Sequence, residues 1–61
     1  MIVQMHDGQE EIIPVEEFCG DIPSFRLSMG ALEIIRIWSD GSGASTVRAY
    51  APGVWAKVKI G

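Results

Sequence analysis

The residues of this 61-residue chain best able to do chemistry are aromatic and basic side chains that interleave in its last half. Aromatic rings beside cations suit single-stranded nucleic acid or a nucleotide, because bases stack on the rings and cations attract the phosphates. The same mixture is typical of protein interfaces, where aromatic side chains dominate the binding free energy. The candidate binding residues are Arg36, Trp38, Arg48, Tyr50, Trp55, Lys57 and Lys59.

Strand alternation predicts that these seven side chains share one face of a sheet. Successive side chains of a strand point to opposite faces. If a hairpin joins 46–51 to 54–60, Val47 and Val58 belong to a small aliphatic core face, and the candidate residues lie on the other face with Ile34. We favour packing over an open nucleic-acid face, because large aromatic side chains on a small sheet usually cover another sheet or subunit.

The remaining reactive residues predict neither catalysis nor a metal site. Cys19 and His6 are the only cysteine and histidine, so a closed four-ligand zinc site cannot form within one chain. Cys19 lies beside Phe18 with no evident base beyond His6, which favours a small buried hydrophobic side chain over a nucleophile. The glycine-rich loop at 40–45 lacks the Lys-Ser/Thr ending of a phosphate-binding loop. We therefore expect no enzymatic activity, no cofactor and no metal.

Short apolar runs separated by turn signals predict a mainly β fold. The expected strands are 1–5, 10–15, 24–30, 31–38, 46–51 and 54–60, with a turn or short 3₁₀ segment at 15–24. Asp7-Gly8 and Pro52-Gly53 predict hairpins. Residues 31–38 also match a helical stripe, so a short helix there is the alternative to a strand. The pattern predicts a small antiparallel barrel or sandwich of about five to six short strands, SH3-like in scale.

Length and composition limit the class of protein. The whole chain, 1–61, is expected to form a single small β domain. A domain of this size buries only roughly 60 % of the surface of its unfolded chain, and one cysteine excludes an intrachain disulfide, so we expect a homo-oligomer. The single thiol and the absence of a signal peptide predict a cytoplasmic protein. No run approaches the roughly 18 apolar residues of a membrane span.

Charge is distributed unevenly along the chain, whose net charge is −3. Residues 1–25 contain acidic side chains but no Lys or Arg, whereas all five Lys and Arg residues follow in 26–61. Opposite charges attract within a subunit or between neighbours. Two interpretations follow: the acidic first part of the chain lies over the basic face and neutralises it, or only one half of the chain faces an anionic partner.

Two functions of different classes follow from these observations. The first is a non-enzymatic, homo-oligomeric domain that binds a protein partner as an adaptor, assembly component or inhibitor. Trp38, Tyr50 and Trp55 would be its anchors, and Arg36 and Arg48 would orient the partner. The alternative is binding of single-stranded nucleic acid or a nucleotide through the same face, and an enzyme built at the central pore of an oligomer is a minor third option.

Overall fold

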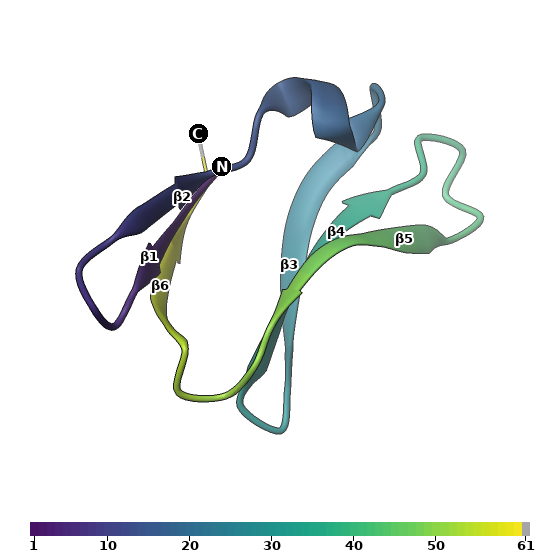
Figure 1. Cartoon of the computed structure of the whole chain (residues 1–61). Coiled ribbons are helices and arrows are strands. Elements are labelled where there is room, and N and C mark those ends of the chain that lie inside the picture. Colours follow the sequence, from purple (N-terminus) through teal and green to yellow (C-terminus); the bar gives the residue numbers. More distant parts are fainter. Residues whose placement is uncertain (61) are drawn as a thin grey trace.

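The computed structural model describes residues 1–60, which form two three-stranded antiparallel sheets packed as a small sandwich (Figure 1). The sheets have the strand orders β2-β1-β6 and β3-β4-β5. The mainly β class is confirmed, and the architecture is an open sandwich rather than a closed barrel. The elements are β1 (Ile2–Met5), β2 (Glu10–Ile12), the 3₁₀ helix η1 (Val15–Phe18), β3 (Ile22–Ser28), β4 (Ala31–Ile37), β5 (Ala44–Tyr50) and β6 (Trp55–Lys59).

Residues 31–37 are a strand, so the alternative of a helix over 31–38 is wrong. β4 pairs with β3 on one edge and with β5 on the other, which makes it the central strand of its sheet. Ile34 and Ile35 lie on opposite faces of β4 and are both buried. Their β-branched side chains fit such a two-sided environment, and this packing outweighs the weak helical periodicity.

Local turn signals are confirmed at two points of the chain. The Asp7-Gly8 pair forms the β1–β2 hairpin, with Gly8 at a φ of +91° and the Met5 N–H donating to the Gln9 carbonyl at 2.8 Å. The predicted 3₁₀ segment begins after Pro14 and ends at Cys19, which adopts the left-handed conformation. No helix within residues 1–60 is long and apolar enough to cross a membrane.

The predicted hairpin at Pro52-Gly53 is wrong, although the turn itself is present. The Val54 N–H donates to the Ala51 carbonyl at 3.2 Å, and Gly53 has the positive φ of +83° that a type II turn requires. The flanking strands do not pair with each other, because β5 pairs with β4 and β6 pairs with β1. The turn therefore carries the chain from one sheet to the other.

The hydrophobic core lies between the two sheets and is closed at one end by η1. Its fully or nearly buried members are Val3, Ile13, Phe18, Leu32, Ile34 and Tyr50. The expectation that β5 and β6 direct only small aliphatic side chains inward is wrong. The second sheet covers the face of β4 and β5 that carries Ile34 and Tyr50, while Ala49 and Ala56 are exposed.

A β-bulge in β6 further changes the expected alternation. The register passes from Gln4 opposite Lys57 to Met5 opposite Trp55, so β6 has one residue more than β1 at this point. A bulge interrupts the two-residue period. Trp55 and Val58 consequently both pack against the core, although they are three residues apart.

Candidate functional site

A charged cluster closes one side of the sandwich, between β2 and β5, which we call the β2–β5 side. Arg48 donates through Nη1 to Oε1 of Glu11 and through Nη2 to Oε2 of Glu17 at 2.7 Å. The Tyr50 hydroxyl donates to the same Glu11 oxygen at 2.9 Å. The cluster therefore joins η1 and both sheets through charge-assisted hydrogen bonds.

The cluster also shifts the pKa values of its members. Burial and then the hydrogen bond to Glu11 raise the pKa of Tyr50, and the opposing effect of Arg48 is smaller. Burial by itself lowers the pKa of Arg48, but its hydrogen bonds to Tyr50, Glu11 and Glu17 outweigh that effect and raise it. Arg48 is thus a fixed cation already engaged with carboxylates.

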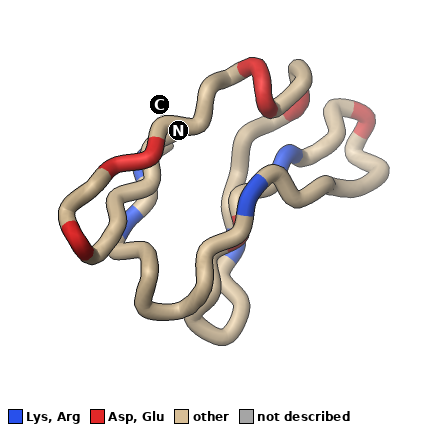
Figure 2. The backbone as a smooth tube through the Cα atoms, viewed as in Figure 1, with Lys and Arg blue, Asp and Glu red and all other residues tan. Residues whose placement is uncertain are grey.

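Carboxylates of the acidic first part of the chain pair with Arg36 and Arg48 of sheet β3-β4-β5, whereas Arg26 pairs with Glu33 of its own sheet. Besides the cluster, Arg36 Nη1 lies 3.4 Å from Oδ2 of Asp21, whose other oxygen accepts the Ser39 N–H at 3.3 Å. Figure 2 shows acidic positions along β2 and the η1 region and basic positions on the opposing strands. Attraction within one subunit therefore accounts for this part of the charge pattern.

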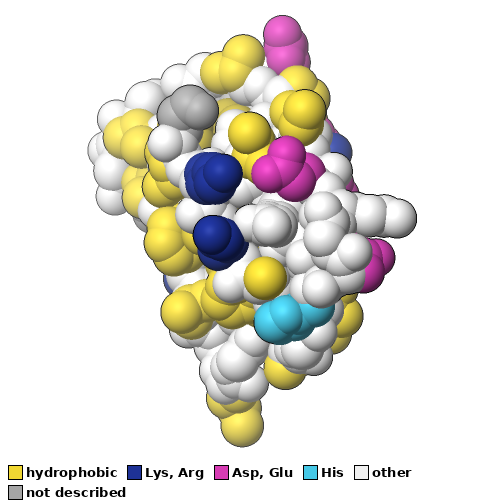
Figure 3. Space-filling model, turned by 90° about the vertical axis from the view of Figure 1, so that its left-hand side faces the viewer, with side chains coloured by type: hydrophobic (Ala, Val, Ile, Leu, Met, Phe, Trp, Pro, Cys, Tyr) yellow, Lys and Arg dark blue, Asp and Glu magenta, His cyan; other side chains and the backbone are white. Residues whose placement is uncertain are grey.

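The seven candidate residues do not share one face, so that sequence interpretation is wrong. Arg48 and Tyr50 lie on the β2–β5 side, whereas Lys57 and Lys59 lie opposite Gln4 and Ile2 on the outer face of sheet β2-β1-β6. Figure 3 shows basic side chains gathered on this outer face. The physical reason is that β5 and β6 belong to different sheets.

The two tryptophans are each fixed by an indole hydrogen bond. Trp38 Nε1 donates to Oγ of Ser45 at 3.0 Å, and Trp55 Nε1 donates to the carbonyl of Gly30 at 3.0 Å. Trp38 packs its ring over Gly43, where an added Cβ would lie only 3.0 Å from the ring. Both indoles are therefore held within the fold, and Trp55 also packs against the hydrophobic core.

The opposite side of the sandwich, between the free edges of β3 and β6, is apolar, and we call it the β3–β6 side. Phe25 and Leu27 of β3 lie opposite Ile34 and Leu32, so their side chains are on the core-facing side of the sheet. Nevertheless Phe25 remains 37 % exposed and Leu27 58 % exposed. An edge strand of this domain thus presents large apolar side chains that the domain itself covers only in part.

The hairpin between β3 and β4 determines which backbone groups face outward. Met29 and Gly30 have φ values of +51° and +85°, which is the geometry of a two-residue type I′ turn. Ser28 and Ala31 flank this turn and form the first hydrogen-bonded pair of the ladder. Because such pairs alternate, Phe25 and Leu27 direct their N–H and C=O groups toward the free edge, and Pro23 directs its C=O there.

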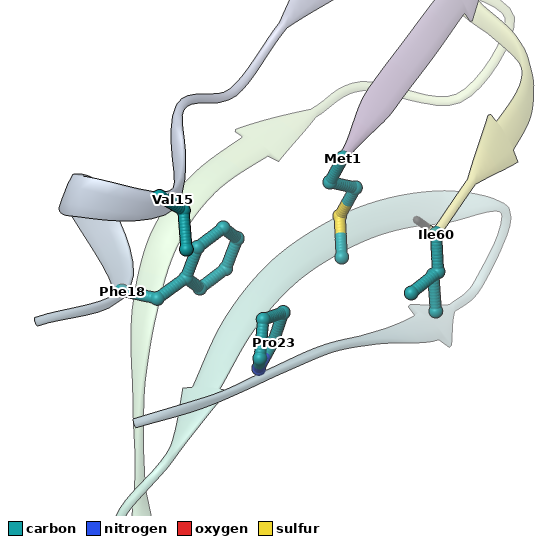
Figure 4. Close-up of a pocket in the computed structure, with 5 residues that line it drawn as sticks. All are labelled: Met1, Val15, Phe18, Pro23 and Ile60. Carbon is teal, nitrogen blue, oxygen red and sulfur yellow. The ribbon is translucent and has the colours of Figure 1, made fainter. Parts of the chain in front are cut away.

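An apolar pocket continues this surface at the start of β3. It has a volume of about 240 Å³ and lies beside η1, the start of β1 and the end of β6 (Figure 4). The side chains that line it are Met1, Val15, Phe18, Pro23 and Ile60. Pro23 belongs to the same face of β3 as Phe25 and Leu27, so the pocket and the strand form one apolar surface.

Among the four edge strands formed by residues 1–60, β3 is the longest that has no bulge. β2 has three residues and is followed by Pro14, β5 contains a bulge at Val47, and β6 carries Lys57 and Lys59. These are the devices by which proteins protect sheet edges. β3 runs for seven residues, and its own protective features are Pro23, which lacks an N–H, and Arg26, which pairs with Glu33.

No group of three or more potential metal ligands converges within residues 1–60. In the loop at 40–43, hydrogen bonds from the side chain and backbone N–H of Ser42 lower the pKa of Asp40. This is the geometry of a local turn, in which an aspartate side chain accepts from the backbone two residues on. The expectation that Cys19 is buried is wrong, because it ends η1 at the surface, where its exposed thiol lies 3.9 Å from the Glu17 carbonyl.

Sequence reasoning missed the β3–β6 side as a candidate site. The alternation of Phe25 and Leu27 with polar residues indicates a strand, but alternation does not show that the strand ends a sheet. Pro23 is the available signal, because proline in a strand favours an edge position.

Comparison with protein-family models, with curated proteins and with solved structures finds no match for this chain. The candidate site therefore stands on the geometry alone.

Proposed function

We propose that this chain is a non-enzymatic interaction domain that binds a protein segment in extended conformation along the β3–β6 side. The observation that carries the proposal is the free edge of β3, where outward backbone groups and exposed Phe25 and Leu27 side chains occur together. In β-strand addition, main-chain hydrogen bonds provide affinity and pockets for alternate side chains provide specificity. Pairing at β3 supplies the first requirement, and the 240 Å³ pocket supplies the second.

Binding of nucleic acid through the aromatic and basic residues has weaker support. Arg36 and Arg48 are already paired with carboxylates, and Tyr50 is buried. A titration with oligothymidine distinguishes the two functions, because affinity for a polyanion falls steeply with added salt. We expect no such salt-dependent binding.

The test of the proposed function uses blocked heptapeptides with apolar residues at alternating positions, added to dilute ¹⁵N-labelled protein. We expect binding peptides to shift the amide signals of Phe25 and Leu27, and backbone N-methylation of the peptide to abolish the effect. Leu27→Lys should remove binding. Ile12→Lys is the matched control, because Ile12 is 68 % exposed on β2, away from this side, and should retain it.

A panel that leaves the β3 amide signals unchanged at millimolar peptide would refute this function. Shifts confined to Lys57 and Lys59 would instead assign binding to the outer face of sheet β2-β1-β6.

A further inference from the structure

We infer that the segment that pairs with β3 is the β3 strand of a second copy of this chain, which makes the protein a two-fold symmetric dimer. This inference rests on the proposed function and names the partner of the same site. In the dimer the two sheets β3-β4-β5 join edge to edge through antiparallel β3 strands. Isologous contact requires that the strand be complementary to itself, and the sequence of β3 meets that condition in one register.

The register that fits places Phe25 on the two-fold axis. Phe25 then lies opposite Phe25 of the second copy, and the two residues exchange their N–H and C=O groups. Leu27 lies opposite Pro23 and donates its N–H to the Pro23 carbonyl. Because Pro23 has no N–H, the second hydrogen bond of this pair, to the Leu27 carbonyl, is absent at each end of the paired segment.

Neighbouring registers are less favourable for reasons visible in β3. A shift by one step toward the turn places Arg26 directly opposite itself, and like charges in that position are destabilising. A shift the other way places Ser24 on the axis and leaves Leu27 beyond the paired segment. With Phe25 on the axis, Arg26 faces Ser24 and retains its ion pair with Glu33 on the same face.

The same register brings an exposed side chain to an apolar pocket. Side chains directly opposite each other across antiparallel strands point to the same face and lie about 5 Å apart. Leu27 of one copy therefore lies beside Pro23 of the other, at the entrance of the pocket that Pro23 lines together with Phe18 and Ile60. The two-fold axis makes this contact reciprocal, so each copy provides one leucine and one pocket.

The small size of the domain also favours association. A 61-residue domain has a small core, and association is one of the few ways for it to cover more apolar surface. The paired surface involves one strand from each copy and is expected to bury less than about 1,200 Å². The dimer should therefore exchange with monomer at micromolar to millimolar concentration.

Sedimentation equilibrium over a micromolar to millimolar series tests the inference. We expect the mass of the unaltered protein to rise toward twice that of the chain, whereas Leu27→Lys stays monomeric and Ile12→Lys associates as the unaltered protein does. Leu27 and Ile12 are 58 % and 68 % exposed, so neither lysine has to enter the core. Circular dichroism and thermal unfolding of both variants verify that they fold.

Disulfide trapping tests the register independently of affinity. In a Cys19→Ser background, Ser24→Cys combined with Arg26→Cys places the new thiols of the two copies opposite each other, within the geometry that a disulfide requires. Ser28→Cys in the same background is the control, because two Ser28 positions would lie about 20 Å apart. We expect oxidation to give a covalent dimer from the first variant and monomer from the second.

The outcomes separate the two proposals. A protein that stays monomeric at millimolar concentration, or a Leu27→Lys variant that associates as well as the unaltered chain, overturns the dimer. If the heptapeptides nevertheless shift the Phe25 and Leu27 amides, the β3 site stands and its partner is a foreign strand. If neither association nor peptide binding occurs, both proposals fail.

Discussion

Substitution of Tyr50 by phenylalanine tests the structural role of the β2–β5 side. Tyr50 is 7 % exposed, and its hydroxyl donates to Glu11 at 2.9 Å. A hydrogen bond to a charged group contributes about 1.5–3 kcal/mol. The side chain of Glu11 is 40 % exposed and keeps its bond to Arg48, so water partly replaces the hydrogen bond that Glu11 loses from Tyr50. We therefore expect Tyr50→Phe to lower the free energy of unfolding by about 1 kcal/mol, or the melting temperature by about 4–8 °C.

The same substitution should change how stability depends on alkaline pH. Burial and the bond to Glu11 raise the pKa of Tyr50 in the folded protein above its value of about 10 in the unfolded chain. The unfolded state then loses its proton first as the pH rises. The contribution of Tyr50 is present in full below about pH 10 and is lost as the pH passes through the folded pKa. The stability difference between the unaltered protein and Tyr50→Phe should consequently narrow above about pH 10.

Urea unfolding followed by tryptophan fluorescence measures both effects. Tyr50 is the only tyrosine, so its titration can also be assigned directly from absorbance. Equal stability of the two proteins at neutral pH, together with equal slopes above pH 10, would refute the hydrogen-bonded cluster. A tyrosine that titrates below the value of a free side chain would refute the stated cause of the pKa shift.

The remaining predictions concern charge and turn geometry, and urea unfolding measures each. Arg48→Ala leaves Glu11 and Glu17 without their cation and should lower the free energy of unfolding by about 1–2 kcal/mol. Arg26→Ala removes an exposed ion pair and should lower it by less than about 0.5 kcal/mol. Equal losses of stability in the two variants would contradict a special role for the cluster. Gly30→Ala should cost about 2 kcal/mol, because its φ is positive and the added Cβ would lie 3.3 Å from Pro52. Gly41 also has a positive φ, but no atom lies within 4 Å of a Cβ added there, so Gly41→Ala should lower the free energy of unfolding by only about 1 kcal/mol. A larger loss for Gly41→Ala than for Gly30→Ala would contradict the role of the Pro52 contact.

The parts of the fold predicted from the sequence are those that depend on neighbouring residues. Gly8 sets the first hairpin because its positive φ is a property of a few adjacent residues. Pro14 begins the 3₁₀ segment in the same local way. Pro52-Gly53 likewise gives the predicted turn, but a turn determines the backbone of four residues and not the pairing of the strands beside it. The pairing of β5 and β6 with different sheets depends on the rest of the chain.

The candidate site could not be predicted for a related reason. Which face of β5 is buried depends on where the second sheet lies, and the aromatic ring of Tyr50 could be assigned to either face from alternation alone. The extra residue opposite Met5 in β6 then changes the alternation again at Trp55. Phe25 and Leu27 are recognisable as strand residues, but their exposure follows from the position of β3 at the end of a sheet.

The distribution of charge along the chain explains why the two sides of the sandwich differ. Glu11 and Glu17 of the first part pair with Arg48 and thereby close the β2–β5 side without covering it by further apolar residues. No comparable cluster of the described residues joins β3 to β6, where Phe25 and Leu27 remain partly exposed. Apolar surface on a free sheet edge promotes aggregation unless a partner covers it. The ion-paired side therefore joins the two sheets within one domain, and the apolar side is the one on which the proposed second strand would pair.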